Sequence, residues 1–160
     1  LEQDRTRWDR LLIRRGLAAL ARCEALGGAL GPYALQAALA ACHARAATAD
    51  ATDWPKIVAL YDVLVRVTPS PIVELNRAVA IAMVQGPRAA LKLVDVLAAD
   101  ATLAGYHWLP SVQGDLLEKL GDHAQASAAF TRAAALTRNA QERDFLLRRA
   151  QHASTSKHAP

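Results

Sequence analysis

Small and aromatic residues recur at fixed intervals between residues 114 and 133, and this pattern constrains the fold more than any other feature. Counted from Gly114, Ala126 comes 12 residues later, Phe130 comes 16 later and Ala133 comes 19 later. Small residues at such intervals let the backbones of two antiparallel helices touch, while an aromatic ring fills the groove beside them. We therefore expect this stretch to form a closely packed helical hairpin.

The composition favours helices throughout the chain. Of its 160 residues, 52% are apolar and only 5% are aromatic. Alanine and leucine dominate, which suits closely packed helices more than a β-sandwich. This length supports one well-buried domain and is too short for two. The sequence therefore predicts an all-α protein.

Proline and glycine mark where the helices begin and end. Proline is tolerated in a first helical turn because its missing N–H would be unpaired there. New apolar periods start at Pro32, Pro55, Pro71, Pro87 and Pro110. Asp53 and Ser70 have the positions of N-caps. The predicted helices span residues 4–26, 33–47, 54–67, 71–85, 87–99, 106–120, 122–136 and 139–152.

These helices are expected to pair into three hairpins: 33–47 with 54–67, 71–85 with 87–99, and 106–120 with 122–136. A plugging side chain recurs as Tyr61, Val94 and Phe130, and each is followed three residues later by Leu64, Leu97 or Ala133. The pattern resembles the tetratricopeptide repeat in an irregular form. The resemblance implies a right-handed superhelix of antiparallel helix hairpins, with capping helices at both ends, in a single domain over residues 1–152. Residues 153–160 are expected to form a disordered tail.

The net charge of +4 is concentrated at the two ends of the chain. Residues 1–22 hold six arginines and three acids, and residues 138–160 hold five basic residues and two acids. Basic ends on a mildly acidic body suit an acidic partner or nucleic acid, or they form a solvated helix face. Cys23 and Cys42 have no metal-site spacing and are interpreted as buried free thiols. No apolar run reaches the length of a membrane span, so we expect a cytoplasmic protein.

The N-terminal stretch EQDRTRWDR is the most unusual segment. On one long helix Arg7, Arg10 and Arg14 would share a face, with Trp8 on another. Asp4 and Asp9 would pair with these arginines or favour the helix N-terminus. Two interpretations stay open: a capping helix whose tryptophan packs on the first hairpin, and a docking helix for a neighbouring domain.

Other polar residues offer weaker candidates. We interpret His43 as a packing residue rather than a metal ligand or a catalytic base. The cluster Tyr106-His107-Trp108 either seals a hairpin or lines a groove. The pair Asn76-Arg77 lies in an apolar helix, where asparagine needs a specific hydrogen bond. No pattern of a zinc, phosphate-binding or nucleophilic catalytic site is present. We therefore expect no enzyme and no cofactor.

Six ordered segments point to a family. They are EQDRTRWD, GPYALQAALAACHA, TDWPKIVALYD, PSPIVELNRAVA, LLEKLGD and ERDFLLRR, which together cover roughly residues 2–150. In this order they resemble the C-terminal extension of a subgroup of bacterial extracytoplasmic-function RNA polymerase sigma factors. That extension is a tetratricopeptide-like domain which follows sigma regions 2 and 4. The chain lacks an initiator methionine, and we take it to be a fragment of such a polypeptide without those regions.

The resemblance implies a regulatory or protein-interaction role in transcription initiation. The partners would be sigma regions 2 and 4 of the same polypeptide or core RNA polymerase, with DNA contacts coming mainly from the absent upstream regions. The family's D-Q-D-R segment falls on residues 2–5, with Glu2 in place of the first acid, and Ala34 stands where the family usually has glutamine. The partner-binding residues carried over from the family motifs are Gln3, Asp4, Arg5, Trp8, Asp9, Tyr33, His43, Asp53, Trp54, Asn76 and Arg77.

Two other hypotheses remain. The first is auxiliary nucleic-acid binding through the arginines of the first and last helices, namely Arg5, Arg7, Arg10, Arg14, Arg148 and Arg149. The second is a small-ligand sensor with a groove near His43, Trp54 and Tyr106.

Overall fold

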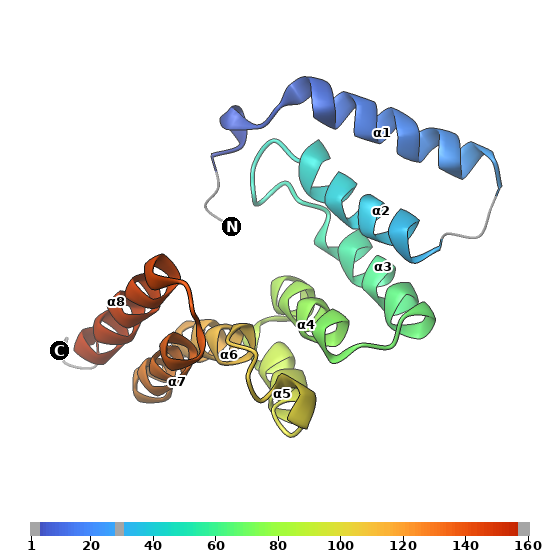
Figure 1. The fold of residues 1–160 in the computed structure, drawn as a ribbon. Coiled ribbons are helices and arrows are strands. Elements are labelled where there is room, and N and C mark those ends of the chain that lie inside the picture. The colour runs from blue at the N-terminus through green and yellow to red at the C-terminus, as the bar shows by residue number, and fades with distance from the viewer. Residues whose placement is uncertain (1–3, 28–30, 157–160) are drawn as a thin grey trace. The chain divides into compact units, whose positions relative to one another are not determined.

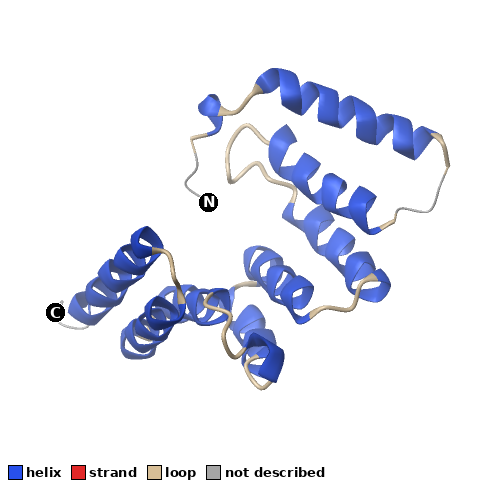
Figure 2. Ribbon diagram, viewed as in Figure 1, coloured by secondary structure: helices blue, strands red, loops and turns tan. Residues whose placement is uncertain are grey.

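The computed structural model describes residues 4–27 and 31–156, and over these ranges the protein consists of helices and connecting loops without a β-strand (Figure 2). The all-α prediction is therefore confirmed for the described residues. A 3₁₀ turn, η1 (Arg5–Arg7), precedes the first α-helix, and a second one, η2 (Ala101–Leu103), follows the fifth. The α-helices are α1 (Arg10–Ala25), α2 (Pro32–Arg45), α3 (Trp54–Val67), α4 (Pro71–Gln85), α5 (Pro87–Leu97), α6 (Trp108–Lys119), α7 (His123–Leu136) and α8 (Ala140–Ser156).

The chain divides into two compact units, Leu1–Val73 and Glu74–Pro160, which we call unit 1 and unit 2. The division falls within the first turn of α4. Each unit has its own packed helices, and the expectation of one domain over residues 1–152 stays a prediction.

In unit 1, α2 contacts both α1 and α3. A small core joins the three helices, with Leu20 from α1, Ala38 and Ala41 from α2, and the partly buried Leu17 and Leu60 at its edge. The predicted hairpin of 33–47 with 54–67 is thus confirmed as the α2–α3 pair.

The prediction of one continuous helix from residue 4 to 26 is wrong. Trp8 is extended, with φ −75° and ψ 141°, and α1 begins only after Asp9. The Asp9 carboxylate accepts the backbone N–H groups of Leu11 and Leu12 at 2.8 and 2.9 Å, so it caps a helix that starts at Arg10. Because Arg7 lies outside α1, it does not share a helix face with Arg10 and Arg14 as the sequence led us to expect.

In unit 2, α6 contacts α5 and α7, and α7 contacts α8 (Figure 1). The hairpin predicted for 106–120 with 122–136 is confirmed as the α6–α7 pair, and the pairing of 71–85 with 87–99 stays a prediction. Phe130 is 1% exposed, and a Cβ at Gly114 would lie 2.6 Å from its ring. Ala126 and Ala133 are fully buried beside it. The small residues therefore allow the close approach that their spacing predicts.

The last helix extends further than predicted. α8 runs to Ser156, four residues beyond the expected end at 152. Ala153 is fully buried in the unit 2 core, which explains why the helix continues into the segment expected to be a tail. Residues 157–160 lie outside the described ranges. The expectation that both thiols are buried is wrong for Cys23, which is exposed on α1, and correct for Cys42.

Among the residues the structure describes, no helix combines the length and the apolar character that crossing a membrane requires.

Candidate functional site

The clearest polar feature of unit 1 is a set of contacts from Arg5 that we call the N-terminal clasp. Arg5 Nη1 donates to the carbonyl oxygens of His43 and Ala46 at 2.9 and 2.8 Å, and Nη2 donates to Thr52 Oγ1 at 3.2 Å. The last carbonyls of a helix have no intrahelical partner, and a cation there also complements the helix dipole. The clasp therefore completes the C-terminus of α2 and ties the η1 turn to the α2–α3 loop.

Two carboxylates shape the backbone that presents Arg5. Asp4 Oδ1 accepts the Thr6 N–H at 3.0 Å and the Thr6 hydroxyl at 2.6 Å, and these hydrogen bonds lower the pKa of the Asp4 carboxyl. Trp8 lies on the other side, with its ring centroid 5.2 Å from the Arg5 guanidinium carbon in a cation–π contact. Asp9 then caps α1. Asp4, Arg5, Trp8 and Asp9, which the family motifs predict to bind a partner, thus contact other residues of this chain.

His43 and Trp54 lie together beside the clasp. Their ring centroids are 5.4 Å apart, and the rings meet edge to face at 76°. Trp54 is 9% exposed and His43 is half-buried. Burial, and then the charge of Arg5, lower the pKa of His43 below its ordinary value. The interpretation of His43 as a packing residue agrees with this geometry.

The remaining predicted site residues do not gather at one place. Asp53 caps α3 by accepting the Lys56 N–H at 3.0 Å, and Tyr33 is 88% exposed at the start of α2. Arg77 pairs with Glu74 within α4, at 3.4 Å. Asn76 is exposed, so its side chain is accessible to solvent, and the hydrogen bond expected of it stays a prediction. Gln3 lies outside the described residues.

Unit 2 contains a cleft that the sequence did not predict as a site. It measures about 110 Å³ and is lined by His107, Trp108, Ser111, Asp115, Phe130, Glu142, Phe145, Leu146 and Arg149. We call it the α8 cleft, because four of these residues belong to α8. Trp108 and Phe145 are 49% and 51% exposed, so two aromatic side chains stand partly free at this cleft.

Arg149 is one of the residues that line the α8 cleft. It donates to Asp115 Oδ1 at 2.6 Å and to Glu118 Oε2 at 2.5 Å, and its guanidinium carbon lies 4.4 Å from the centroid of Phe130. Burial disfavours the charge of Arg149, but the hydrogen bond to Glu118 and the charge of Asp115 outweigh it, so the pKa of the guanidinium lies above its ordinary value. One side chain of α8 therefore joins two carboxylates of α6 to an aromatic ring of α7.

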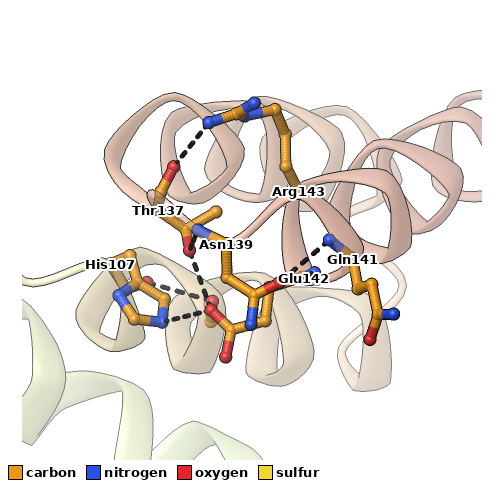
Figure 3. A network of polar contacts seen from close by, with 7 residues as sticks. His107, Thr137, Asn139, Gln141, Glu142 and Arg143 are labelled. Atoms are coloured by element: carbon orange, nitrogen blue, oxygen red, sulfur yellow. Dashed lines mark hydrogen bonds and ion pairs between the residues drawn. The ribbon is translucent and has the colours of Figure 1, made fainter.

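A polar network around the start of α8 includes the cleft residues His107 and Glu142 (Figure 3). Thr137 is 4% exposed and donates its hydroxyl to Glu142 Oε2 at 2.8 Å, while Arg143 donates to the Thr137 carbonyl at 3.0 Å. Asn139 Oδ1 accepts the Gln141 N–H at 2.9 Å and thereby caps α8. The turn between α7 and α8 is thus held in place by its own side chains.

His107 approaches this network from the N-terminus of α6. Its Nε2 lies 3.3 Å from Glu142 Oε2, without the geometry of a hydrogen bond, so the two groups attract each other as ions only when the imidazole is protonated. Two members of the cluster Tyr106-His107-Trp108, His107 and Trp108, therefore line a cleft, which is one of the two interpretations that the sequence offered. The segment ERDFLLRR, which the sequence offered only as a family motif, supplies Glu142, Phe145, Leu146 and Arg149.

Comparison with known proteins adds one relative. An uncharacterized protein of Rhizobium meliloti (strain 1021) is 42% identical to this chain over 151 residues, which are 94% of the chain and 35% of the relative. The chain thus spans about a third of the length of the curated relative that it matches. No protein-family model matches the chain. No solved structure matches it either.

Within the described ranges, no three His, Cys, Asp or Glu side chains are grouped as a metal site would require.

Proposed function

We propose that this chain is a protein-interaction module of a bacterial extracytoplasmic-function sigma factor, with the irregular tetratricopeptide-like architecture that its sequence resembles. In this proposal it acts in the cytoplasm by binding and not by catalysis. It regulates transcription initiation through contact with sigma regions 2 and 4 or with core RNA polymerase.

One observation carries the proposal: among the described residues, α1 presents an exposed face that is both apolar and basic, directly after the N-terminal clasp. Leu11 and Leu12 are 48% and 62% exposed, and the exposed Arg15, which follows them by four and three residues, lies on the same helix face. Exposed apolar side chains rimmed by charge are typical of protein interaction surfaces. Because Arg5 fastens the chain just before α1, a domain on the N-terminal side of residue 4 would be held close to this face.

Two further observations support the proposal. The six ordered segments extend over nearly the whole chain, and the relative of which the chain spans 35% leaves room for further domains. Arg5 and Arg149, two of the arginines considered for nucleic-acid binding, donate to acceptors within the protein. The small-ligand groove near His43, Trp54 and Tyr106 would need residues from both compact units, and it stays a prediction.

The proposal is tested with the part of the polypeptide that lies on the N-terminal side of this chain, expressed separately and titrated with it. We expect a complex, and we expect replacement of Leu11 and Leu12 by serine to weaken it about tenfold or more. Burial of each half-exposed leucine in the contact would contribute about 1 kcal/mol to the free energy of binding.

The matched control is Leu26→Ser, because Leu26 is 86% exposed at the opposite end of α1 and should not affect binding. Equal binding by all three proteins, with unchanged helix content by circular dichroism, would remove α1 as the docking helix. Absence of any complex would argue against the intramolecular partner and leave core RNA polymerase to be tested by the same titration.

A further inference from the structure

We propose that the α8 cleft of unit 2 binds an arginine side chain presented by a protein partner. The inference rests on the proposed function only in taking the partner to be a protein. It assigns a second contact surface, apart from α1, and it names the side chain that this surface selects.

The size of the cleft decides between a metabolite and a single side chain. Sites for cofactors and small-molecule ligands usually enclose about 300–1,000 Å³, whereas this cleft measures about 110 Å³. An enclosed apolar cavity that holds one benzene molecule measures about 150 Å³, so the smaller α8 cleft takes up only the end of a ligand that reaches in from the surface. The α8 cleft therefore fits one side chain, seated from a larger surface outside it.

The charge at the cleft selects a cation. Asp115 and Glu142 line the cleft together with Arg149, and Glu118, outside the lining, also pairs with Arg149, so the group has three negative charges and one positive charge. A protonated His107 would still leave one negative charge in excess. Asp115 accepts a hydrogen bond from Arg149 through Oδ1 at 2.6 Å, and Glu142 accepts one from Thr137 through Oε2 at 2.8 Å. These side chains are 49% and 39% exposed, so both carboxylates are partly accessible from solvent.

The walls of the cleft select arginine over lysine. Trp108 and Phe145 are half-exposed and apolar, and a planar guanidinium stacks on such rings while its edge donates to carboxylates. The protein already uses this arrangement once, because Arg149 lies over Phe130 while it donates to Asp115 and Glu118. Arg143 does not compete for the cleft, since it is turned to the Thr137 carbonyl (Figure 3).

The test uses the whole chain and a minimal probe, N-acetyl-L-arginine methylamide, followed by proton–nitrogen correlation NMR. The chain has three tryptophans, so its indole N–H signals report separately on Trp8, Trp54 and Trp108. We expect a saturable shift of the Trp108 signal in the millimolar range, with the other two indoles unmoved. The matched citrulline probe has the same shape without the charge, and it should bind several times more weakly.

Two variants locate the site. Glu142→Gln keeps the shape of the side chain and should weaken the arginine probe about threefold, as loss of a partly exposed ion pair does. Asp144→Asn removes an exposed carboxylate of the same helix that does not line the cleft, and it should leave binding unchanged.

An unmoved Trp108 signal would overturn the inference, and so would equal binding of the arginine and citrulline probes or equal effects of the two variants. The outcome is separate from that of the proposed function. A Trp108 shift without a complex between the chain and its N-terminal neighbour would keep the cleft and reject that partner. A complex without the shift would do the reverse.

Discussion

Arg5 shows how a single side chain organises one end of a helical unit. Its guanidinium reaches two carbonyl groups at the end of α2 and a nearly buried hydroxyl in the loop that follows. A planar group with five N–H donors can satisfy such divergent acceptors at once, whereas an ammonium group concentrates its donors at one point.

Replacing Arg5 by alanine should lower the free energy of unfolding of unit 1 by about 1–3 kcal/mol, because partly buried carbonyl groups lose a charged donor. Arg5→Lys should recover only part of this loss. Urea unfolding followed by circular dichroism measures both. Arg7→Ala serves as the control, since Arg7 is exposed in the same turn and should change stability by less than about 0.5 kcal/mol. Equal effects at residues 5 and 7 would mean that the clasp does not stabilise the fold.

His43 makes the stability of unit 1 depend on pH. Because its pKa in the folded protein is below the ordinary 6.5, the unfolded chain binds the proton more tightly. Its contribution is therefore fully present above pH 6.5 and is lost as the pH falls through the lowered value. Thermal unfolding between neutral pH and pH 5 should show a steeper loss for the natural protein than for His43→Gln. Asp4 and Asp100 do not interfere, since their pKa values are lowered from 3.8 and lie below this range. Parallel slopes for the two proteins would contradict the assignment.

Among the elements, the α6–α7 hairpin owes its close packing to the absence of one side chain. A Cβ at Gly114 would meet three atoms of the Phe130 ring at 2.6–2.9 Å. Phe130 is 1% exposed in the unit 2 core and Arg149 lies over its ring, so a displacement of the ring would disturb these contacts.

Gly114→Ala should therefore destabilise unit 2 by about 1–3 kcal/mol, the range for overpacking a well-packed core. The control is Gly16→Ala in α1, where a new Cβ meets no atom within 4 Å. There the substitution should stabilise the helix by about 0.5–1 kcal/mol, because alanine is the better helix former. The two substitutions are thus expected to have opposite signs in the same unfolding experiment. A loss of stability at both positions would show that the contact between a new Cβ at residue 114 and Phe130 does not explain the destabilisation.

The elements could be predicted from the sequence wherever proline or glycine and the apolar period agreed. The ranges 54–67 and 71–85 match α3 and α4 at both ends, and four other helices match within two residues. The predicted start of the first helix is wrong because the apolar period continues through Trp8. That Asp9 caps the helix is seen only from its hydrogen bonds to the backbone. The predicted range of the last helix is too short because the burial of Ala153, which extends α8, depends on tertiary contacts.

The candidate sites were less predictable than the helices. Family motifs led to Arg5 and His43, but their local roles in the clasp depend on residues about 40 positions apart in the sequence. The α8 cleft combines side chains from three helices, and no local spacing in the sequence relates Trp108 to Phe145 or Arg149. The available signal was the helical spacing in ERDFLLRR, which places Glu142, Phe145 and Arg149 three and four residues apart and thus on one helix face.

At the scale of the whole molecule, the chain divides into two compact units, and the boundary between them falls within the first turn of α4. Each unit has its own core and its own polar site, the clasp in unit 1 and the α8 cleft in unit 2. Local perturbations should then stay local, because sites without shared partners act independently.

Hydrogen exchange measured by mass spectrometry tests this independence. Arg5→Ala should speed exchange in α2 and α3 and leave α6 and α7 unchanged, while Gly114→Ala should do the opposite. Equal acceleration in both units by either substitution would show instead that the chain unfolds as one cooperative domain, as the sequence led us to expect.

The clasp also determines where a mechanical load would enter the protein. Tension applied through a domain on the N-terminal side of residue 4 would act first on the hydrogen bonds from Arg5 to the end of α2. Those bonds lie upstream of α1 in the chain, so they shield that helix from the pull until they break. Breaking the hydrogen bonds of the Arg5 guanidinium would release the η1 turn, and the force would then act on α1.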